Sequence, residues 1–335
     1  MRVARRLQRC LRLFRSSAII LCYHRVTELE SDPHLLSVTP QNFREQLQVL
    51  KRLYRVARLQ DWASEQTIAA RPTVIVTFDD GYADNFDKAL PLLQEAECPA
   101  TIFVTAGKIG DNREFWWDEL DRVILEPAHL PEELSLSIRG HDHYWNTAAT
   151  CDRQRRDGWH VLLEQKATPR QAAYVGLCHL LKVIDEVERS RVLDELCTWA
   201  GVERLGRSSH RSLTAPELCS LAASELIEIG SHTITHPQLS SLPASAQQFE
   251  IEKSKAMLES SIGRPVHSFS YPFGGVNDYN LDTIRMVRNA GFHCACANYP
   301  GLSSHAAERY QLPRFVVRNW GGDYFAKTLK CWAAS

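Results

Sequence analysis

Two neighbouring carboxylates stand at the end of a run of residues typical of a buried strand. The run covers residues 74–78 (Val-Ile-Val-Thr-Phe), and Asp79, Asp80 and Gly81 follow it directly. Adjacent side chains at a strand end point in different directions, so one carboxylate can bind a metal ion while its neighbour handles protons. Gly81 allows a sharp turn of the backbone after them. Asp-Asp-Gly also forms ordinary turns, so this segment alone leaves a purely structural role open.

Two histidines follow a second predicted strand, at residues 226–229. His232 and His236 stand at positions i and i+4, a spacing that would place both imidazoles on one face of a helical turn, where they can bind one ion. A single histidine is more often structural, but a pair beside a strand end favours a metal site. Together with one aspartate they form a two-histidine, one-carboxylate set, which leaves coordination positions open for water and substrate.

A third segment, residues 269–275 (Phe-Ser-Tyr-Pro-Phe-Gly-Gly), also ends a predicted strand. Pro272 and the two glycines predict an unusual backbone path, on which the N–H of Phe273 could serve as an oxyanion donor. An ordinary turn with a buried aromatic side chain explains this segment equally well.

Two single residues complete the set. His24 follows the predicted strand at residues 19–23, and Arg314 lies in the last predicted strand. Each could be structural. In a parallel β/α barrel, however, the side chains at the C-terminal strand ends converge on one mouth, so His24 and the residues of the three segments would meet there.

The elements that must position these residues alternate between short β-rich runs and helical patterns, which is typical of a parallel sheet or barrel. The predicted strands are residues 19–23, 73–78, 100–105, 226–229, 266–271, 293–297 and 312–317. One predicted helix begins after Thr39 as N-cap with Pro40 at its first position. Two more are predicted at about residues 278–291 and 243–262. Residues 113–212 show helical segments with few strand signals, which predicts a helical insertion that either packs on the barrel or closes as a lid.

The composition excludes several classes of protein. The 335 residues are 44% hydrophobic and 24% charged, which is ordinary for a globular protein. With 39 basic and 40 acidic residues the formal charge is −1, so we expect no nucleic-acid partner. The ten cysteines contain no C-x-x-C pair, which argues against a zinc ribbon or a redox motif. Cys294 and Cys296 alternate as buried strand residues would, and so many unpaired thiols suit a reducing cytoplasm.

The first 15 residues contain six arginines and no acid. Their apolar residues cluster on one side of a helical projection, which predicts a basic amphipathic helix over residues 1–16. Such a helix could lie peripherally on an anionic membrane through residues 1–15, or pack on the domain, and the sequence leaves both open. No apolar run reaches the roughly 20 residues needed to span a bilayer. We therefore expect a cytoplasmic protein, with peripheral membrane contact as an alternative.

The three motifs, at residues 77–82, 231–236 and 270–274, resemble those of the polysaccharide deacetylase family, the NodB-homology domain of carbohydrate esterase family 4. The likeness spans residues 18–112 and 213–320. It implies a distorted (β/α)7 barrel. Residues 17–335 would then form a single catalytic barrel, interrupted by the helical insertion at about 113–212 and preceded by the helix at 1–16.

The resemblance also implies roles for the site residues. Asp79 would be the catalytic base, and the Phe273 N–H would bind the oxyanion. Asp80, His232 and His236 would bind one divalent metal ion, Zn²⁺ in the first instance, with Co²⁺, Ni²⁺, Fe²⁺ or Mn²⁺ as alternatives.

Two departures from the family pattern matter. Ser270 stands where the family usually has an arginine, and the Leu-x-His motif expected near the C-terminus is missing. Some members that act on exopolysaccharide are circularly permuted and carry the acid histidine on an early strand, and His24 is similar to that arrangement. Arg314 would replace the missing arginine beside Asp79.

The function implied by the resemblance is metal-dependent removal of N-acetyl groups from amino sugars in a glycan or a glycan precursor. Metal-activated water would attack the amide, Asp79 would take its proton, and His24, protonated near neutral pH, would donate to the departing amine. An N-acetylated amino sugar would yield acetate and a free amine. Two alternatives remain: a saccharide-binding protein that has lost catalysis, and a related C–N hydrolase that acts on a non-acetyl amide such as a formamide.

Overall fold

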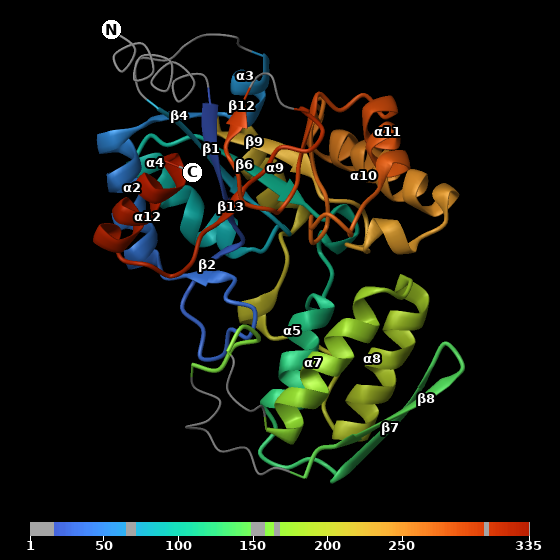
Figure 1. Ribbon diagram of the computed structural model, residues 1–335. Helices are drawn as coiled ribbons and strands as arrows, with labels where there is room; N and C mark the ends of the chain where they lie inside the picture. Colours follow the sequence, from blue (N-terminus) through green and yellow to red (C-terminus); the bar gives the residue numbers. More distant parts are fainter. Residues whose placement is uncertain (1–16, 65–71, 149–157, 164–167, 305–307, 335) are drawn as a thin grey trace, which may run out of the picture. The chain divides into compact units, whose positions relative to one another are not determined.

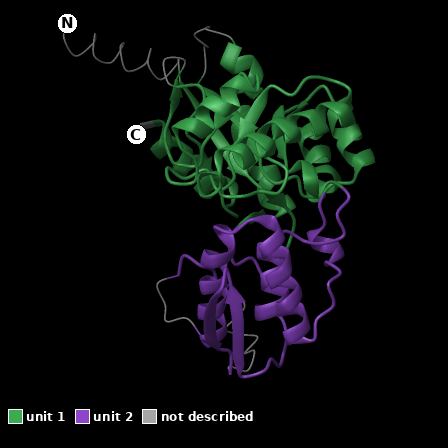
Figure 2. Ribbon diagram, turned by 90° about the vertical axis from the view of Figure 1, so that its right-hand side faces the viewer, with its two compact units in different colours: residues 1–28, 36–109, 213–335 green, residues 29–35, 110–212 purple. Residues whose placement is uncertain are grey.

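A computed structural model describes residues 17–64, 72–148, 158–163, 168–304 and 308–334. The chain forms two compact units, which Figure 2 distinguishes by colour. The first unit contains residues 1–28, 36–109 and 213–335, and the second contains residues 29–35 and 110–212. The basic helix predicted at residues 1–16 lies outside the described residues. Within the described part, no helix combines the length and the apolar character that a membrane crossing needs.

The first unit is built on a curled, mostly parallel sheet (Figure 1). Its main strands run in the spatial order β11, β10, β9, β6, β5, β1 and β12, and all neighbours pair in parallel except β12 with β1. The strands are β1 (Ser17–Tyr23), β4 (Arg55–Ala57), β5 (Thr73–Phe78), β6 (Ala100–Val104), β9 (Ile227–Ser231), β10 (Ser268–Ser270), β11 (Cys294–Cys296), β12 (Ser303–Ser304) and β13 (Phe315–Val316). A separate pair is formed by β2 (Arg25–Val26) and β3 (Ser37–Val38).

The segment that ends in β13 connects the two edges of this sheet. On one side, Leu312 exchanges backbone hydrogen bonds with Ala295 and Ala297 of the β11 segment. On the other side, β13 pairs in parallel with β1 in the register Leu21 to Phe315. The strands therefore curl into a barrel, and each of the seven predicted strands contributes to it. The predicted α/β fold with a distorted parallel barrel is confirmed.

Helices cover the outside of the barrel. They are α2 (Pro40–Leu53), α3 (Leu59–Ser64), α4 (Leu90–Glu95), α9 (Ala215–Ala223), α10 (Ala244–Ile262), α11 (Leu281–Asn289) and α12 (Gly322–Ala334), with a π-helical turn at Asn85–Ala89 before α4. In Figure 1, α2 lies beside α12 and α10 beside α11. The predicted cap of α2 is confirmed, because the Thr39 side chain accepts a hydrogen bond from the Asn42 N–H. Helix α11 begins later than predicted, because Asn280 caps it with its own side chain.

Alternate residues of the strands face opposite sides of the sheet, as the strand period requires. On β1, Ile19 and Leu21 join the large apolar core that also contains residues of the covering helices, whereas Ala18 and Ile20 join a smaller cluster with Ile75 and Phe103 inside the barrel. Cys294 and Cys296 belong to this inner cluster, so their predicted burial is confirmed. The candidate site lies at the C-terminal ends of the strands, where they border the inside of the barrel.

The second unit contains α5 (Trp116–Leu120), a π-helical turn at Asp121–Leu125, α7 (Pro169–Lys182) and α8 (Glu186–Ala200). It also contains an antiparallel pair, β7 (Glu133–Ile138) and β8 (His141–Asn146), with Glu133 opposite Asn146. The insertion, in which we expected helical segments with few strand signals, therefore contains those helices and a strand pair as well. The strand signal was present, because β7 alternates between exposed polar residues and buried Leu134, Leu136 and Ile138.

Candidate active site

Asp79 lies directly after β5, at the end of the strand, and is almost completely buried. Arg314 binds its carboxylate with two parallel hydrogen bonds, from Nη1 to Oδ1 at 2.7 Å and from Nη2 to Oδ2 at 2.6 Å. Such a two-pronged contact fixes the plane of the carboxylate as well as its position. The structure thus brings together two residues that are 235 positions apart in the chain.

Arg314 is itself held by three further acceptors. Its Nε donates to the carbonyl of Ala297 at 2.8 Å, Nη1 donates to the hydroxyl of Thr77 and Nη2 to that of Ser270. The Ser270 hydroxyl in turn donates to Asp79 Oδ2 at 3.2 Å. Burial raises the pKa of Asp79, but the Arg314 guanidinium and the neighbouring histidines outweigh it and hold that pKa well below its usual range.

Asp80, His232 and His236 form a second buried group beside Asp79. The Nε2 atoms of the two histidines lie 3.5 and 3.4 Å from Asp80 Oδ1, and the histidine rings are 4.8 Å apart between centroids. All three side chains are at least nine-tenths buried. The structure therefore places the three predicted metal ligands together, with one ligand atom of each facing the others.

The hydrogen bond of His232 selects its tautomer. Its Nδ1 lies 2.8 Å from the carbonyl oxygen of Ser270, and because a carbonyl only accepts, Nδ1 carries a hydrogen, so in the neutral ring Nε2, the atom that faces Asp80, has the lone pair that can bind a metal ion. A metal-binding histidine typically donates its other N–H to a backbone carbonyl in this way. Burial alone lowers the pKa of His232, but the charges of Asp79 and Asp80 raise it above its usual value. The site attracts a positive charge.

These observations fit a metal ion. Two nitrogen or oxygen ligands of a tetrahedral Zn²⁺, each about 2.0–2.2 Å from the ion, lie roughly 3.4 Å apart. The separations of Asp80 Oδ1 from the two histidine nitrogens are 3.5 and 3.4 Å. Two imidazoles and one carboxylate are ligands that first-row divalent metals accept.

The loop that carries the histidines is not the helical turn predicted from their spacing. Residues 232–238 form bends without helical hydrogen bonds, and Thr233 and His236 have positive φ angles of 66° and 57°. The Thr233 hydroxyl accepts the backbone N–H of His236 at 3.1 Å. This hydrogen bond holds the loop in the turn from which the His236 side chain faces Asp80. The prediction of a helical face is wrong, although the two side chains meet as expected.

Backbone strain concentrates at this site. Of the seven non-glycine residues with positive φ in the described part of the chain, four belong to it: Asp80, Thr233, His236 and Phe273. Each such residue costs on the order of 1–3 kcal/mol, so surrounding contacts must hold it in place. Asp80 has a φ of 75° directly after Asp79, and the two carboxylates have different partners: that of Asp80 faces the two histidines, and that of Asp79 binds Arg314.

Glu250 of α10 holds the histidine loop, a role that the sequence did not reveal. One of its carboxylate oxygens accepts the backbone N–H groups of Ile234 and Thr235 at 2.7 and 3.0 Å, and the other accepts the Thr235 hydroxyl at 2.7 Å. Glu250 is itself almost fully buried. One side chain of a neighbouring helix therefore fixes the middle of the loop that carries His232 and His236.

Phe273 lies in the loop after β10 with a φ of 59°. Its ring contacts the ring of His236 edge to face, with 4.7 Å between centroids. The positive φ agrees with the unusual backbone path predicted from Pro272 and the following glycines. A side chain at Gly274 would collide with Asn298, since its Cβ would lie 2.7 Å from the Asn298 nitrogen.

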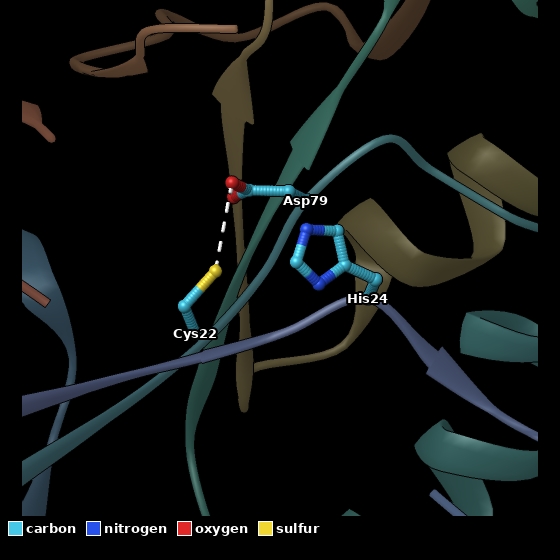
Figure 3. A group of neighbouring side chains, drawn as sticks. All are labelled: Cys22, His24 and Asp79. Carbon is cyan, nitrogen blue, oxygen red and sulfur yellow. Dashed lines mark hydrogen bonds between the residues drawn. The ribbon is translucent and has the colours of Figure 1, made fainter. Parts of the chain in front are cut away.

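His24 follows β1 and lies half-buried in a group with Cys22 and Asp79 (Figure 3). Its carbonyl accepts a hydrogen bond from the Asn85 side chain at 2.9 Å. Burial lowers the pKa of the His24 imidazole below its usual value, although Asp79 and Asp80 oppose this effect. Burial therefore favours the neutral form of the ring, and a His24 that is protonated near neutral pH stays a prediction.

The family model of polysaccharide deacetylases matches residues 67–157 and 201–295, together more than half of the chain. The chain belongs to the polysaccharide deacetylase family. The matched ranges contain Asp79, Asp80, His232, His236 and Phe273. His24 and Arg314 lie outside them, in the flanking segments that complete the barrel.

Known members of the polysaccharide deacetylase family resemble the chain in sequence and in fold. YxkH of Bacillus subtilis (strain 168), a polysaccharide deacetylase by name, is 29% identical over 119 residues, which are 35% of this chain and 42% of YxkH. The match thus spans less than half of that relative.

Three solved structures share the fold at low sequence identity. IcaB from Ammonifex degensii has a TM-score of 0.58 at 16% identity, covering 96% of this chain and 98% of its own. The deacetylase PplD of Streptococcus pyogenes, solved in complex with acetate, has a TM-score of 0.57 at 17% identity, with coverages of 93% and 97%. The polysaccharide deacetylase BC0361 of Bacillus cereus has a TM-score of 0.56 at 16% identity, with coverages of 93% and 69%. These likenesses agree with the curled parallel barrel.

Proposed function

We propose that this protein is a metal-dependent hydrolase that removes N-acetyl groups from amino sugars in a glycan or a glycan precursor. The observation that carries the proposal is the position of Asp79, an ionised carboxylate that Arg314 orients beside the group Asp80, His232 and His236. Amide hydrolysis needs a base for the attacking water and an electrophilic centre for the carbonyl. Membership of the polysaccharide deacetylase family supports N-acetylated sugars as the substrate class.

Asp80, His232 and His236 would hold the metal. A divalent ion there supplies a Lewis acid that polarises the amide carbonyl and makes water a better nucleophile at neutral pH. Zn²⁺ suits two imidazoles and one carboxylate, and Co²⁺, Ni²⁺, Fe²⁺ or Mn²⁺ are the alternatives that the same ligands accept.

The protein groups divide the proton transfers between them. Asp79 accepts a proton from the water that attacks the acetyl carbonyl, and Arg314 keeps its carboxylate turned toward that water. The Phe273 N–H is the proposed donor to the oxyanion. Cleavage of the C–N bond then yields acetate and a free amine, which must gain one proton as it leaves.

His24 is the proposed donor of that proton. Burial favours its neutral form, and Asp79 in the same cluster, which gains a proton at the preceding step, is the proposed source of the proton that His24 donates. Since the pKa of Asp79 is held low, Asp79 binds this proton weakly and can pass it on. We propose that the proton moves from water to Asp79, then to His24, and finally to the amine.

The two alternative functions differ in what they need. A saccharide-binding protein without catalysis has no need for an oriented base, and the argument for it is the absence of both the family arginine at Ser270 and the Leu-x-His motif. Arg314 now occupies the position beside Asp79, which favours catalysis. A hydrolase of formamides would use the same groups, so only a choice of substrates separates it from a deacetylase.

The test combines metal analysis with acetate release from free, nucleotide-linked and lipid-linked N-acetyl sugars, and with the corresponding N-formyl compounds. We expect one divalent ion per chain and acetate from at least one class. Asp79→Asn should lower kcat/KM at least about 100-fold while the metal stays bound. His232→Ala should lose the metal, and Asp323→Asn, an exposed carboxylate, serves as control.

Full activity of Asp79→Asn would refute the assignment of the base. A metal-free protein that binds saccharides without releasing acetate would instead identify the binding protein. Formate release without acetate release would identify the formamide hydrolase.

A further inference from the structure

The cluster of Cys22, His24 and Asp79 contains a thiol that the proposed reaction does not use. Cys22 and His24 stand two positions apart at the end of β1, so both project to the side on which Asp79 lies (Figure 3). One ligand atom from each of the three lies within 4.8 Å of the other two. The Cys22 thiol itself donates to Asp79 Oδ2 at a sulfur–oxygen distance of 3.7 Å. The cluster shares no residue with Asp80, His232 and His236.

We propose that Cys22, His24 and Asp79 form a second metal site, which takes a thiophilic divalent ion such as Zn²⁺ or Cd²⁺ and thereby inhibits the enzyme. The inhibition rests on the proposed function, because it assumes that Asp79 and His24 act in catalysis. The binding itself depends only on the three donors and their geometry.

The donor set matches this class of ion. A thiolate, an imidazole and a carboxylate are all regular Zn²⁺ ligands, at about 2.3 Å for sulfur and about 2.0–2.2 Å for nitrogen and oxygen. Three donor atoms within 4.8 Å of one another can reach one ion after small side-chain rotations. Sulfur makes the site selective for thiophilic ions over Mg²⁺ or Ca²⁺, which prefer oxygen ligands. As the ion binds, the Cys22 thiol releases its proton to solvent.

Two features make this site weaker than the one at Asp80. Arg314 binds both oxygens of Asp79, so the ion must share that carboxylate with a fixed positive charge. Oδ2 already accepts hydrogen bonds from Arg314 and Ser270, but Oδ1 accepts one from Arg314, so its second lone pair is the one that geometry leaves for the ion. Cys22 is completely buried, which leaves half-buried His24 as the side from which an ion enters. We therefore expect an ion that binds at excess metal and dissociates on dilution or mild chelation.

Inhibition follows from the identity of the ligands. An ion on Asp79 removes the lone pair that accepts a proton from water, and the same ion on His24 blocks the donor to the amine. Cys22 would then act as an anchor that gives the second site its preference for thiophilic ions.

The binding experiment measures bound Zn²⁺ per chain by equilibrium dialysis at rising free Zn²⁺, for the wild type, Cys22→Ser and Cys219→Ser. Cys219 is an exposed free cysteine and controls for adventitious thiol binding. We expect two ions per chain for the wild type and Cys219→Ser, and one for Cys22→Ser. His24→Gln is a second route to the same loss should Cys22→Ser not fold.

The activity experiment measures the concentration of Zn²⁺ or Cd²⁺ that halves the rate of each protein relative to its own rate with one equivalent of metal. Cys22→Ser should raise that concentration at least about 10-fold, as removal of one ligand predicts. Equal inhibition of wild type and Cys22→Ser, or a second ion retained in both Cys22→Ser and His24→Gln, would overturn the proposal. A wild type that takes up two ions but releases no acetate would instead contradict the proposed function and leave the second site standing.

Discussion

The Arg314–Asp79 ion pair fixes the position and the charge of the carboxylate that we propose as the catalytic base. Both side chains are buried, and every donor group of the guanidinium has a hydrogen-bond acceptor. Removal of one partner from such a pair leaves an uncompensated buried charge, which typically costs about 3–5 kcal/mol. The pair therefore supports the fold as well as the proposed chemistry, and an experiment must separate the two roles.

A swap of the arginine position separates them. Arg314→Ala should lower kcat/KM roughly 100-fold, because Asp79 loses its fixed orientation, and should also lower the melting temperature. Ser270 contacts both residues of the pair, so Ser270→Arg in the Arg314→Ala background should restore part of the activity. Ser270→Lys should restore less, because an ammonium group cannot bind a carboxylate with two parallel hydrogen bonds.

The readouts are kcat/KM for acetate release and the melting temperature of each variant. A double variant that regains stability without activity would show that stability alone does not restore the reaction and that an arginine at position 270 does not orient Asp79 as Arg314 does. Undiminished kcat/KM in Arg314→Ala would contradict the orienting role altogether.

At the scale of elements, the loop between β9 and α10 is strained, and a side chain of α10 stabilises it. Thr233 and His236 both have positive φ, and the Glu250 carboxylate accepts three hydrogen bonds from Ile234 and Thr235 between them. Without Glu250 the loop would lose the contacts that offset its strain. His236, whose direction depends on the loop, would then be the ligand that moves most.

Glu250→Ala should therefore weaken metal binding about 10- to 100-fold, the usual effect of removing a group that orients a metal ligand. Glu250→Gln should have a smaller effect, because its amide oxygen still accepts one set of hydrogen bonds. The measurement is the affinity of the apo protein for Zn²⁺ or Co²⁺ in competition with a chelator. Glu252→Ala, an exposed carboxylate on the same helix, is the matched control. An unchanged affinity in folded Glu250→Ala would show that the loop holds its shape unaided.

At the scale of the whole molecule, the inside of the barrel is more polar than its strand pattern indicates. Glu228 of β9 is buried there and accepts hydrogen bonds from the hydroxyls of Ser268 and Thr101 and from the backbone N–H of Gln60. Burial raises the pKa of Glu228, and these hydrogen bonds only partly offset the effect. The barrel therefore encloses a carboxyl group that resists ionisation.

The raised pKa of Glu228 makes the stability of the protein depend on pH. With a pKa raised in the folded state, Glu228 binds its proton more tightly in the native than in the unfolded chain, so its contribution to stability declines as pH rises above the ordinary glutamate value. Glu228→Gln cannot ionise and keeps a group able to bond the same partners. Its melting temperature relative to the wild type should therefore increase between pH 5 and pH 8. Glu225→Gln, which is exposed, should show no such trend, and a constant difference for Glu228→Gln would contradict the raised pKa.

The local patterns of the sequence determined the elements and most of the candidate site. Seven strands, the cap of α2 and the placement of Asp79, Asp80, His232, His236 and Phe273 at strand ends follow from short-range properties: alternation, capping residues and turn formers. Such properties depend on neighbours within a few positions, so one sequence suffices to read them. The hairpin of β7 and β8 was not predicted, because its short alternating pattern lies between longer helical segments.

Only the tertiary structure decided which of these residues touch. The 312–317 segment joins β11 to β1 and carries Arg314 to Asp79, across 235 positions of the chain. The histidine loop takes its shape from Glu250 on the following helix, where the spacing of the histidines alone predicted a helical turn. The lowered pKa of His24 likewise depends on everything packed around it. Contacts, strain and pKa values arise from groups that meet only when the barrel closes, so no local pattern contains them.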